Sequence, residues 1–222
     1  MKKLLARGNT AEVYEYSEGK VCKLFFEGYP AEYVELEFRN AKELYDRNIR
    51  VPVPFKLITI DNRRGIIYEK IEGRSLLNLI AENPEKADKY IDILTKTHLA
   101  ILSQKSKELL SYKDFLSVMV KNRTADYREI CTKMDALPDG DHILHGDFHP
   151  NNILMEENGT PVVIDFMNVC RGPKLFDIAR TVFLIRPLSE YMAERYLEKV
   201  QVSEEEIKEY LDVIAICRNY EG

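Results

Sequence analysis

The sequence predicts an α+β protein with two lobes, a strand-rich N-terminal lobe at residues 1–72 and a mainly helical C-terminal lobe at residues 73–222. Before residue 72, apolar and polar residues mostly alternate and turn residues separate the runs, as in half-buried strands. After Gly73, apolar residues recur every three or four positions, which is the spacing of amphipathic helices. A chain of 222 residues is long enough to bury a core in such an arrangement.

The N-terminal lobe is predicted to contain two hairpins separated by one helix. A turn at Gly19 joins the first two strands, and an extended Val51–Pro54 segment leads into the second hairpin, with a polar turn at residues 61–64. Between the hairpins, Val34, Phe38, Ala41 and Tyr45 form the apolar stripe of a helix. The expected strands are 11–16, 21–25, 55–60 and 65–71, and the expected helix is 32–46.

The C-terminal lobe is predicted to be helical around one short hairpin. That hairpin has Asn158-Gly159 at its turn, a pair typical of tight hairpin connections. Ser203 and Glu206 form a capping box that opens a last helix. The other expected helices include Tyr90–Ile101, Phe115–Asn122 and Asp177–Ile185, and the expected hairpin strands are 153–155 and 161–164.

Charge and cysteine content exclude several classes of function. The chain has 32 Lys and Arg against 37 Asp and Glu, a net charge of −5, whereas nonspecific nucleic-acid binding requires a basic surface. No apolar stretch approaches the roughly 18–20 residues of a membrane-spanning helix. The four cysteines are far apart, which suits reduced thiols. We therefore expect a cytoplasmic protein that binds neither nucleic acid nor membrane.

The negative charge is concentrated at the C-terminus. Residues 189–222 contain 4 basic and 9 acidic side chains, which accounts for the whole net charge. Acidic residues favour a helix N-terminus, so part of this cluster is explained by the capping box without any ligand. The alternative is that the cluster contacts a cationic acceptor, and its candidate residues are then Glu204, Glu205, Glu206 and Glu209.

The densest group of polar residues is the block His-Gly-Asp-Phe-His-Pro-Asn-Asn-Ile-Leu at 145–154. Asp147 and Asn152 stand five positions apart in a non-helical segment that contains Pro150. The hairpin then returns the chain to Asp165 at the end of an apolar run. Few, hard oxygen ligands of this kind suit a Mg²⁺–phosphate site. The Asp-x-x-x-x-Asn spacing also matches the kinase catalytic loop, in which the Asp accepts the substrate's hydroxyl proton and the Asn binds metal.

Two other interpretations of this block are less consistent with the sequence. Gly-Asp-Phe-His resembles part of a metallophosphoesterase, but a two-metal site needs further His and Asp blocks, and His98 and His142 lie in none. In the second interpretation the acids cap turns and the histidines are satisfied in a core. The combination of the 145–152 block with Ile164-Asp165-Phe166 argues against it.

A phosphoryl-transfer site also needs partners in the N-terminal lobe. Gly8, Asn9 and Thr10 form a turn before a strand, where backbone N–H groups and a hydroxyl can cover phosphates, although most such turns are plain turns. Lys23 lies within an apolar strand, where an unpaired ammonium is costly unless it reaches solvent from an edge strand. Glu37 lies only about 60° from the centre of the helical stripe, so it is the one acid of that helix able to face the strands. We predict that Glu37 pairs with Lys23.

These residues together resemble the aminoglycoside phosphotransferase and choline kinase-like superfamily, distant relatives of the eukaryotic protein kinases. The resemblance extends over nearly the whole sequence, from the Gly8 turn to Asp177-Ile178-Ala179-Arg180. It implies a bilobal protein kinase-like fold. The N-terminal lobe, a small antiparallel sheet with one helix, would bind nucleotide, and the helical C-terminal lobe would carry the catalytic loop and the acceptor site.

The resemblance also implies roles for five polar residues. Asp147 would be the catalytic base that orients the acceptor hydroxyl. Asn152 and Asp165 would hold Mg²⁺. Lys23, held by Glu37, would bind the α- and β-phosphates of ATP, with GTP left open as the nucleotide.

Four further residues receive expectations from the resemblance and from their positions. The backbone C=O of Glu69 and the N–H of Ile71 would meet the adenine edge. Asp177 would brace the catalytic loop, although a simple N-cap explains it equally well. His98, on the core face of a helix, is expected to be a satisfied core histidine.

The expected activity is ATP- and Mg²⁺-dependent phosphorylation of a hydroxyl on a small molecule, such as an aminoglycoside, choline or a sugar, with cationic acceptors among the candidates. An atypical protein kinase is the first alternative, but Met167-Asn168 replaces the glycine that follows the metal-binding Asp in protein kinases. A non-catalytic nucleotide-binding module is the second, and the presence of all five polar kinase residues disfavours it. The sequence predicts neither the acceptor nor the oligomeric state.

Overall fold

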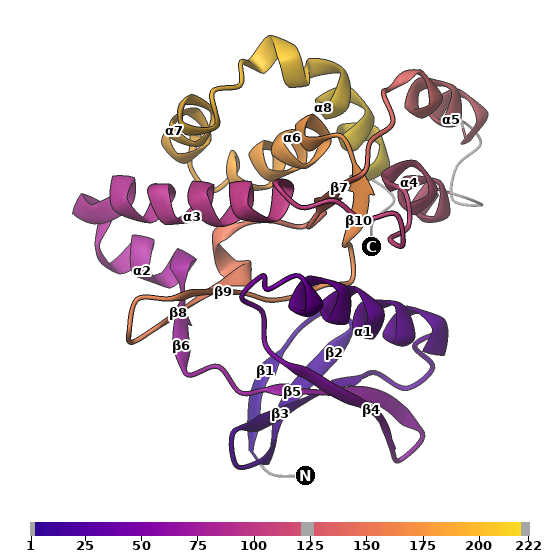
Figure 1. Cartoon of the computed structure of the whole chain (residues 1–222), viewed down its shortest axis with the longest axis vertical. Helices are drawn as coiled ribbons and strands as arrows, with labels where there is room; N and C mark the ends of the chain where they lie inside the picture. The colour runs from indigo at the N-terminus through magenta and orange to yellow at the C-terminus, as the bar shows by residue number, and fades with distance from the viewer. Residues whose placement is uncertain (1–2, 121–126, 219–222) are drawn as a thin grey trace. The chain divides into compact units, whose positions relative to one another are not determined.

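A computed structural model describes residues 3–120 and 127–218, and its contacts divide the chain into two compact units. The N-terminal unit comprises residues 1–75 and 153–167, and the C-terminal unit comprises residues 76–152 and 168–222. The chain therefore crosses between the units three times. Antiparallel sheet dominates the N-terminal unit and helices dominate the C-terminal unit, which confirms the predicted α+β class (Figure 1).

The main sheet of the N-terminal unit has five antiparallel strands in the order β1-β2-β3-β5-β4 (Figure 1). Its strands are β1 (Leu4–Arg7), β2 (Ala11–Ser17), β3 (Lys20–Phe25), β4 (Pro54–Ile60) and β5 (Arg63–Glu69). On the central strand β3, Lys23 is paired with Val13 of β2 and with Ile66 of β5. Lys23 therefore does not lie on an edge strand, and its ammonium must be satisfied within the unit.

One long helix, α1 (Ala31–Asp46), packs against β4 and β5 of this sheet (Figure 1). It confirms the helix predicted at 32–46. Val34 and Ala41 of the predicted stripe are buried, but Tyr45 is exposed and its neighbour Leu44 is buried instead. The buried face therefore lies slightly to one side of the stripe drawn from the apolar residues alone, and Glu37 is part of it.

The turn between β4 and β5 is shorter than the sequence predicted. Asp61 and Asn62 both have positive φ, 47° and 62°, and β5 begins directly afterwards at Arg63. Two-residue hairpin turns need positive φ at their central positions, and Asp and Asn tolerate this better than most residues. Arg63 and Arg64 therefore belong to the strand, because the polar run that suggested a four-residue turn continues along β5.

A smaller sheet, β6-β8-β9, completes the N-terminal unit. Its strands are β6 (Gly73–Ser75), β8 (Ile153–Glu156) and β9 (Pro161–Val163), and Ile153 pairs with Val163. The predicted hairpin at 153–164 is confirmed. In its turn Gly159 has a φ of 84°, and the Thr160 N–H donates to Asn158 Oδ1 at 2.8 Å.

The C-terminal unit is built mainly from helices. They are α2 (Leu76–Glu82), α3 (Ala87–Leu102), α4 (Tyr112–Val120), α5 (Tyr127–Ala136), α6 (Lys174–Ile185), α7 (Glu190–Val200) and α8 (Glu204–Arg218), with short 3₁₀ turns η1 (Pro84–Lys86) and η2 (Pro150–Asn152). Two short strands, β7 (His142–Leu144) and β10 (Cys170–Gly172), pair antiparallel. Asn122, expected in a helix, lies outside the described residues.

Two helix boundaries bear on the sequence predictions. The capping box is confirmed, because the Ser203 N–H donates to Glu206 Oε2 at 2.8 Å and the Glu206 N–H donates to Ser203 Oγ at 3.4 Å. Helix α6 begins at Lys174 with Pro173 as its N-cap residue, so the interpretation of Asp177 as an N-cap is wrong. Within the described ranges, no helix is long and apolar enough to span a membrane, and no disulfide bond joins the cysteines.

The β4–β5 turn yields a prediction about stability. Replacing Asn62 with Gly should raise the free energy of unfolding by up to about 1 kcal/mol, since glycine adopts positive φ without steric cost. Asn62→Ala should lower it by about 1 kcal/mol for the same reason. Urea unfolding measures both, and equal stabilities of the two variants would contradict the conformation assigned to the turn.

Candidate active site

The polar residues predicted to act on a nucleotide meet at Lys23 in the N-terminal unit. Lys23 Nζ lies 2.8 Å from Glu37 Oε1 and 2.9 Å from Oε2, so both carboxylate oxygens accept from the ammonium. The Glu37 side chain is 1% exposed and that of Lys23 is 18% exposed. The predicted pair between β3 and α1 is therefore confirmed. Its binding of phosphates stays a prediction.

A second carboxylate completes this cluster. Asp165 Oδ1 lies 3.0 Å from Lys23 Nζ, and the Asp165 side chain is 44% exposed. Burial opposes the charged form of Lys23, but the carboxylates of Glu37 and Asp165 outweigh that effect and raise the pKa of the ammonium. Lys23 therefore remains cationic at any physiological pH, while Asp165 presents a half-exposed carboxylate beside it.

Glu37 is held from a further direction. The Tyr68 hydroxyl donates to Glu37 Oε1 at 3.3 Å, and Tyr68 is itself buried at the end of β5. Burial raises the pKa of Glu37, while Lys23 and Tyr68 act in the opposite direction because they favour the carboxylate. Sequence reasoning missed Tyr68, since a tyrosine in a strand gives no indication of which helix residue it contacts.

Asp147 and Asn152 lie together in the C-terminal unit, on the loop from β7 to η2. Asn152 Nδ2 donates to the Asp147 backbone oxygen at 2.9 Å and to Asp147 Oδ2 at 3.3 Å. Because both contacts use the amide nitrogen, the carboxamide oxygen of Asn152 is the atom left to bind a cation. The loop thus presents one carboxylate and one amide oxygen, as the Asp-x-x-x-x-Asn spacing predicted.

Asp147 is strongly acidic. Burial would raise its pKa, but a hydrogen bond with His149 and electrostatic interactions with His149, Arg180 and His145 lower the pKa of Asp147 to about 2. His149 Nε2 is 3.6 Å from Asp147 Oδ2. Asp147 is therefore a carboxylate throughout the physiological pH range and can accept a hydrogen bond from a hydroxyl.

The backbone of this loop is fastened by Asp177 of α6. The His145 N–H donates to Asp177 Oδ2 at 2.7 Å and the Gly146 N–H donates to Oδ1 at 2.9 Å. Asp177 is fully buried, and although burial opposes its ionisation, hydrogen bonds and the charges of His98 and His145 lower its pKa. Asp177 therefore acts as a brace of the loop in this structure.

Gly146 can only be glycine in this loop. Its φ is +75°, and a Cβ atom at this position would lie 2.1 Å from the backbone oxygen of Asn168. Arg180, buried one turn after Asp177 on α6, donates its Nε to the Gly146 carbonyl. Both backbone groups of Gly146 are thus bound by α6, and the residue next to Asp147 is fixed in place.

His98 extends the brace further into the core. It is buried on α3, where Nε2 lies 2.9 Å from Asp177 Oδ2 and Nδ1 lies 2.6 Å from the Tyr196 hydroxyl. Its ring also stacks on Phe148, with centroids 4.2 Å apart. The prediction of a satisfied core histidine is confirmed, with the addition that its partner is the loop brace.

The turn predicted to cover phosphates lies between β1 and β2. Gly8, Asn9 and Thr10 are all exposed, and the Gly8 N–H donates to the Ala11 carbonyl at 2.9 Å. The Thr10 carbonyl accepts from the Phe26 N–H at 2.9 Å, which ties the turn to the end of β3. A Cβ atom on Gly8 would have ordinary contacts, the nearest being Ala11 O at 3.7 Å. The fold therefore does not require glycine at this position.

The segment expected to contact adenine follows β5. The Glu69 N–H donates to the Val53 carbonyl at 3.0 Å, and the Lys70 N–H donates to the Gly19 carbonyl at 2.9 Å. The Glu69 side chain bonds to Arg50, whose guanidinium also reaches Glu156 at 3.2 Å. Arg50 is a residue that sequence reasoning missed, because its partners lie 19 and 106 positions away.

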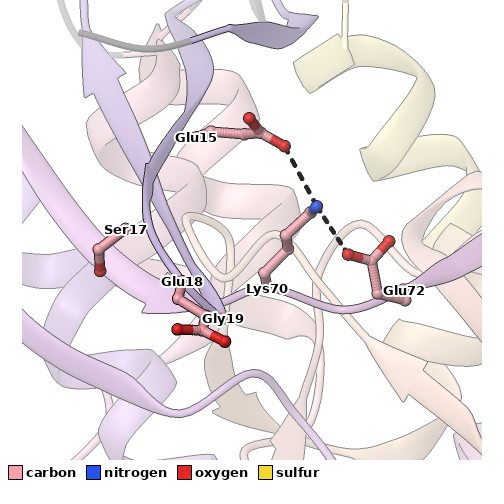
Figure 2. A pocket seen from close by; sticks show the side chains of 6 residues that line it. All are labelled: Glu15, Ser17, Glu18, Gly19, Lys70 and Glu72. Carbon is pink, nitrogen blue, oxygen red and sulfur yellow. Dashed lines mark hydrogen bonds and ion pairs between the residues drawn. The ribbon is translucent and has the colours of Figure 1, made fainter.

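A cavity of about 350 Å³ lies beside this segment, next to the β2–β3 turn (Figure 2). Figure 2 shows Lys70 between Glu15 and Glu72, to which its Nζ is bonded at 3.2 Å and 2.6 Å. The other residues that line it are Ser17, Glu18 and Gly19. From this segment Lys70 and Glu72 line the cavity, and the contact of Glu69 and Ile71 with adenine stays a prediction.

Two of the acidic residues at the start of α8 already have partners within the chain. Glu204 forms an ion pair with Arg186, and Glu206 accepts from Ser203 in the capping box. Glu205 and Glu209 are exposed. These contacts within the chain explain part of the acidic cluster without a ligand. Contact between the cluster and a cationic acceptor stays a prediction.

The donor atoms fit magnesium better than a transition metal. The described residues include no group of three or more His, Cys, Asp and Glu side chains arranged to hold a metal ion. Taken separately, Asp165 of the N-terminal unit offers a carboxylate and Asn152 of the C-terminal unit offers an amide oxygen. Mg²⁺ commonly uses one or two protein oxygens together with substrate phosphates. The residues present therefore fit a metal that enters with a nucleotide.

A lysine paired with a helix glutamate on a five-stranded sheet, together with an Asp-x-x-x-x-Asn loop braced by a buried aspartate, defines a kinase-like phosphotransferase. Comparisons with known proteins identify the family within this class. The sequence matches the phosphotransferase enzyme family, APH, over residues 3–210, and the chain belongs to this family.

Solved structures of aminoglycoside phosphotransferases share the fold. APH(4)-Ia has a TM-score of 0.72 at 17% identity, covering 99% of this chain and 85% of the other. The type VIII aminoglycoside-3′-phosphotransferase has a TM-score of 0.69 at 15% identity, covering 95% and 91%. APH(3″)-Id from Streptomyces rimosus has a TM-score of 0.64 at 13% identity, covering 93% and 89%. A search of curated proteins gave no match.

The loop brace yields a prediction about stability and pH. Asp177→Ala should lower the free energy of unfolding by about 3–5 kcal/mol, because two buried N–H groups and His98 lose their acceptor. Urea unfolding at pH 7 measures this, with exposed Asp114→Ala on α4 as control.

The stability that Asp177 contributes should depend on pH, and the sign of this dependence follows from the direction of its pKa shift. The pKa of Asp177 is lower in the folded state, so its ionised form stabilises the protein above the unfolded pKa near 4, and this is lost as pH falls toward the folded pKa. The stability difference between wild type and Asp177→Asn should therefore shrink between about pH 5 and pH 3. A difference that stays constant over this range would contradict an ionised brace.

Proposed function

We propose that this phosphotransferase moves the γ-phosphate of ATP, with Mg²⁺, to a hydroxyl of a small molecule and uses Asp147 as catalytic base. The observation that carries the proposal is the partly buried Lys23 ammonium, held by both oxygens of Glu37 beside the half-exposed Asp165. A fixed cation next to an accessible carboxylate suits the phosphates of a metal–nucleotide complex. The N-terminal lobe, residues 1–72, would hold the nucleotide, and residues 73–222 would carry the catalytic loop and the acceptor site.

Structures of similar proteins support a nucleotide and a small acceptor. A variant of APH(4)-Ia has been solved in a ternary complex with AMP-PNP and hygromycin B. APH(3″)-Id has been solved with ADP and streptomycin. We therefore propose hydroxylated acceptors of this type, including cationic ones, and ATP as the phosphate donor, with GTP as a competing donor in the assay.

In the proposed reaction each residue has a limited task. The Asp147 carboxylate accepts a hydrogen bond from the acceptor hydroxyl and orients its oxygen. A bond forms between that oxygen and the γ-phosphorus while the bond to the β-phosphate oxygen breaks, and the hydroxyl proton passes to Asp147 and then to solvent. Lys23 would contact the α- and β-phosphates, and Asn152 and Asp165 would hold Mg²⁺, which neutralises phosphate charge.

The nucleotide contacts complete the proposal. Backbone N–H groups at Gly8, Asn9 and Thr10 would cover the phosphates, and the Glu69 C=O and Ile71 N–H would meet the edge of the adenine. All of these groups belong to the N-terminal unit, whose strands β1, β2 and β5 position them. Positioning and charge neutralisation, more than proton transfer, would account for the rate, since Asp147 is a weak base.

An acceptor panel tests the activity directly. We expect ADP release by the full chain with ATP and Mg²⁺ to depend on one class of acceptor among aminoglycosides, choline, sugars and homoserine. A parallel incubation with labelled ATP and a protein lysate tests for protein phosphorylation. Label transferred to proteins but to no small acceptor would contradict the proposed substrate class.

The catalytic base is tested by substitution. Asp147→Ala should lower kcat by roughly 10²–10⁴-fold while the ATP dissociation constant changes less than about twofold, because Asp147 is assigned to the acceptor and not to the nucleotide. Asp141→Ala, an aspartate six residues earlier that pairs with Lys105, is the matched control and should retain activity. Turnover by Asp147→Ala at the rate of the control would exclude Asp147 as the base.

The pH profile provides a second test of Asp147. With a pKa of about 2, Asp147 is ionised well below pH 4. The acidic limb of kcat should therefore not contain an ionisation near pH 4, the ordinary value of an aspartate. An acidic limb near pH 4 that disappears in Asp147→Asn, measured on its residual activity, would contradict the assigned protonation state.

The phosphate turn is tested at Gly8. Gly8→Val should raise KM for ATP several-fold, since the fold leaves room for a side chain there and only an approaching phosphate would require its absence. Unfolding in urea should change by less than about 0.5 kcal/mol, which separates a ligand effect from a folding effect. An unchanged KM would show that the turn does not approach the nucleotide.

A further inference from the structure

A buried asparagine on α1 contacts the chain directly after Asp165. Asn40 is 2% exposed and lies three residues after Glu37, on the same face of the helix. Its Nδ2 donates to the Phe166 carbonyl at 2.9 Å, across 126 positions of sequence. Helix α1 therefore supplies two buried polar groups to this region, the Glu37 carboxylate that binds Lys23 and the Asn40 amide that binds the residue after Asp165.

The segment that Asn40 contacts has an unusual backbone. Asp165 has a φ of +68°, in the left-handed region that residues other than glycine seldom adopt. Such a conformation costs about 1–3 kcal/mol and persists only where surrounding contacts enforce it. Asp165 belongs to neither β9, which ends at Val163, nor any helix, so regular hydrogen bonding does not hold it. Its own ion pair with Lys23 and the contacts of its neighbours must do so.

Two contacts on Phe166 can enforce this conformation. One is the hydrogen bond from Asn40 to its carbonyl, and the other is the packing of its ring against Tyr68, with centroids 6.2 Å apart. The ring contact fixes the side chain of Phe166. The Asn40 amide instead fixes the peptide group that contains the Phe166 carbonyl, which is the next one after the peptide group joining Asp165 to Phe166. Of the two, only the hydrogen bond defines the direction of the backbone.

We propose that Asn40 is a positioning residue for the metal ligand Asp165. By fixing the Phe166 carbonyl, Asn40 holds the Asp165 backbone in its left-handed conformation and directs the carboxylate toward the cation that accompanies the nucleotide. The inference rests on the proposed function, which assigns Asp165 to Mg²⁺. Loss of a group that orients a metal ligand typically lowers metal affinity 10–100-fold, which gives the size of the expected effect.

Binding measurements test this without relying on turnover. The dissociation constant of ADP is measured by calorimetry on the full chain with EDTA and again with Mn²⁺, and Mn²⁺ bound to the enzyme–ADP complex is counted by electron paramagnetic resonance. Asn40→Ala removes the amide. Val34→Ala, a buried truncation on the same helix, is the matched control for general destabilisation.

We expect Asn40→Ala to weaken Mn²⁺ binding in the ADP complex at least tenfold, while the affinity for ADP in EDTA stays within about twofold of wild type. Val34→Ala should leave the ratio of the two ADP affinities unchanged. The inference is overturned if Asn40→Ala retains wild-type Mn²⁺ affinity, or if its two ADP affinities fall together. If Asn40→Ala does not fold, the same titrations on Asn40→Leu, which keeps the volume and lacks the donor, decide the question.

A third variant separates failure of this inference from failure of the proposed function. Asp165→Ala should abolish the metal-dependent part of ADP binding. If it does and Asn40→Ala does not weaken Mn²⁺ binding, only the positioning role of Asn40 is wrong. If Asp165→Ala binds Mn²⁺ and ADP as wild type does, the assignment of Asp165 as metal ligand is wrong, and the inference falls with it.

Discussion

The N-terminal unit is organised around one positive charge that cannot reach bulk water freely. Lys23 lies on the central strand of a five-stranded sheet, and leaving an ammonium unpaired there would cost several kcal/mol. Its two partners come from distant parts of the chain, Glu37 from α1 and Asp165 from the segment after β9. The need to satisfy this one charge therefore constrains both the rotation of α1 about its axis and the return of the β8–β9 hairpin to the sheet.

The loop that contains Asp147 is an irregular segment that must be held in one conformation. A loop has no ladder of backbone bonds, so its amides need other acceptors. Asp177 provides one carboxylate for two successive N–H groups, those of His145 and Gly146, and Arg180 donates to the Gly146 carbonyl that follows them. His98 Nε2 bonds to the same carboxylate, and the Tyr196 hydroxyl bonds to His98 Nδ1 and so holds the histidine ring. Loop geometry is thus determined by three helices of the core.

Sequence periodicity predicted the parts of this architecture that depend on a single element. The position of Glu37 followed from the helical repeat, and the apolar run before Asp165 predicted a hairpin strand. Periodicity shows which face of a helix or strand a residue occupies. It does not show which residue of another element that residue contacts. Tyr68, Asn40 and Arg50 were missed for this reason, since their contacts depend on elements far away in the sequence.

Short or highly charged elements were also not predicted from the sequence. Strands β7 and β10 have three residues each, too few to establish an alternating pattern. Helix α7 buries only Met192, Ala193, Tyr196 and Leu197 among charged neighbours, so its apolar stripe is brief. Asp177 was assigned the wrong place on its helix because the N-terminal turn of α6 is opened by Pro173, whose extended backbone serves as a cap without a side-chain bond.

The three chain crossings between the two units have a consequence for dissecting the protein. A fragment that ended at residue 75 would include β6 but not β8 and β9, the strands with which β6 forms its sheet, and it would leave Lys23 without Asp165. The N-terminal lobe predicted from the sequence and the N-terminal folded unit therefore contain different residues. Expression of the N-terminal unit in isolation would require residues 153–167 to be supplied, either on a second polypeptide or by joining them to residue 75 through a designed linker.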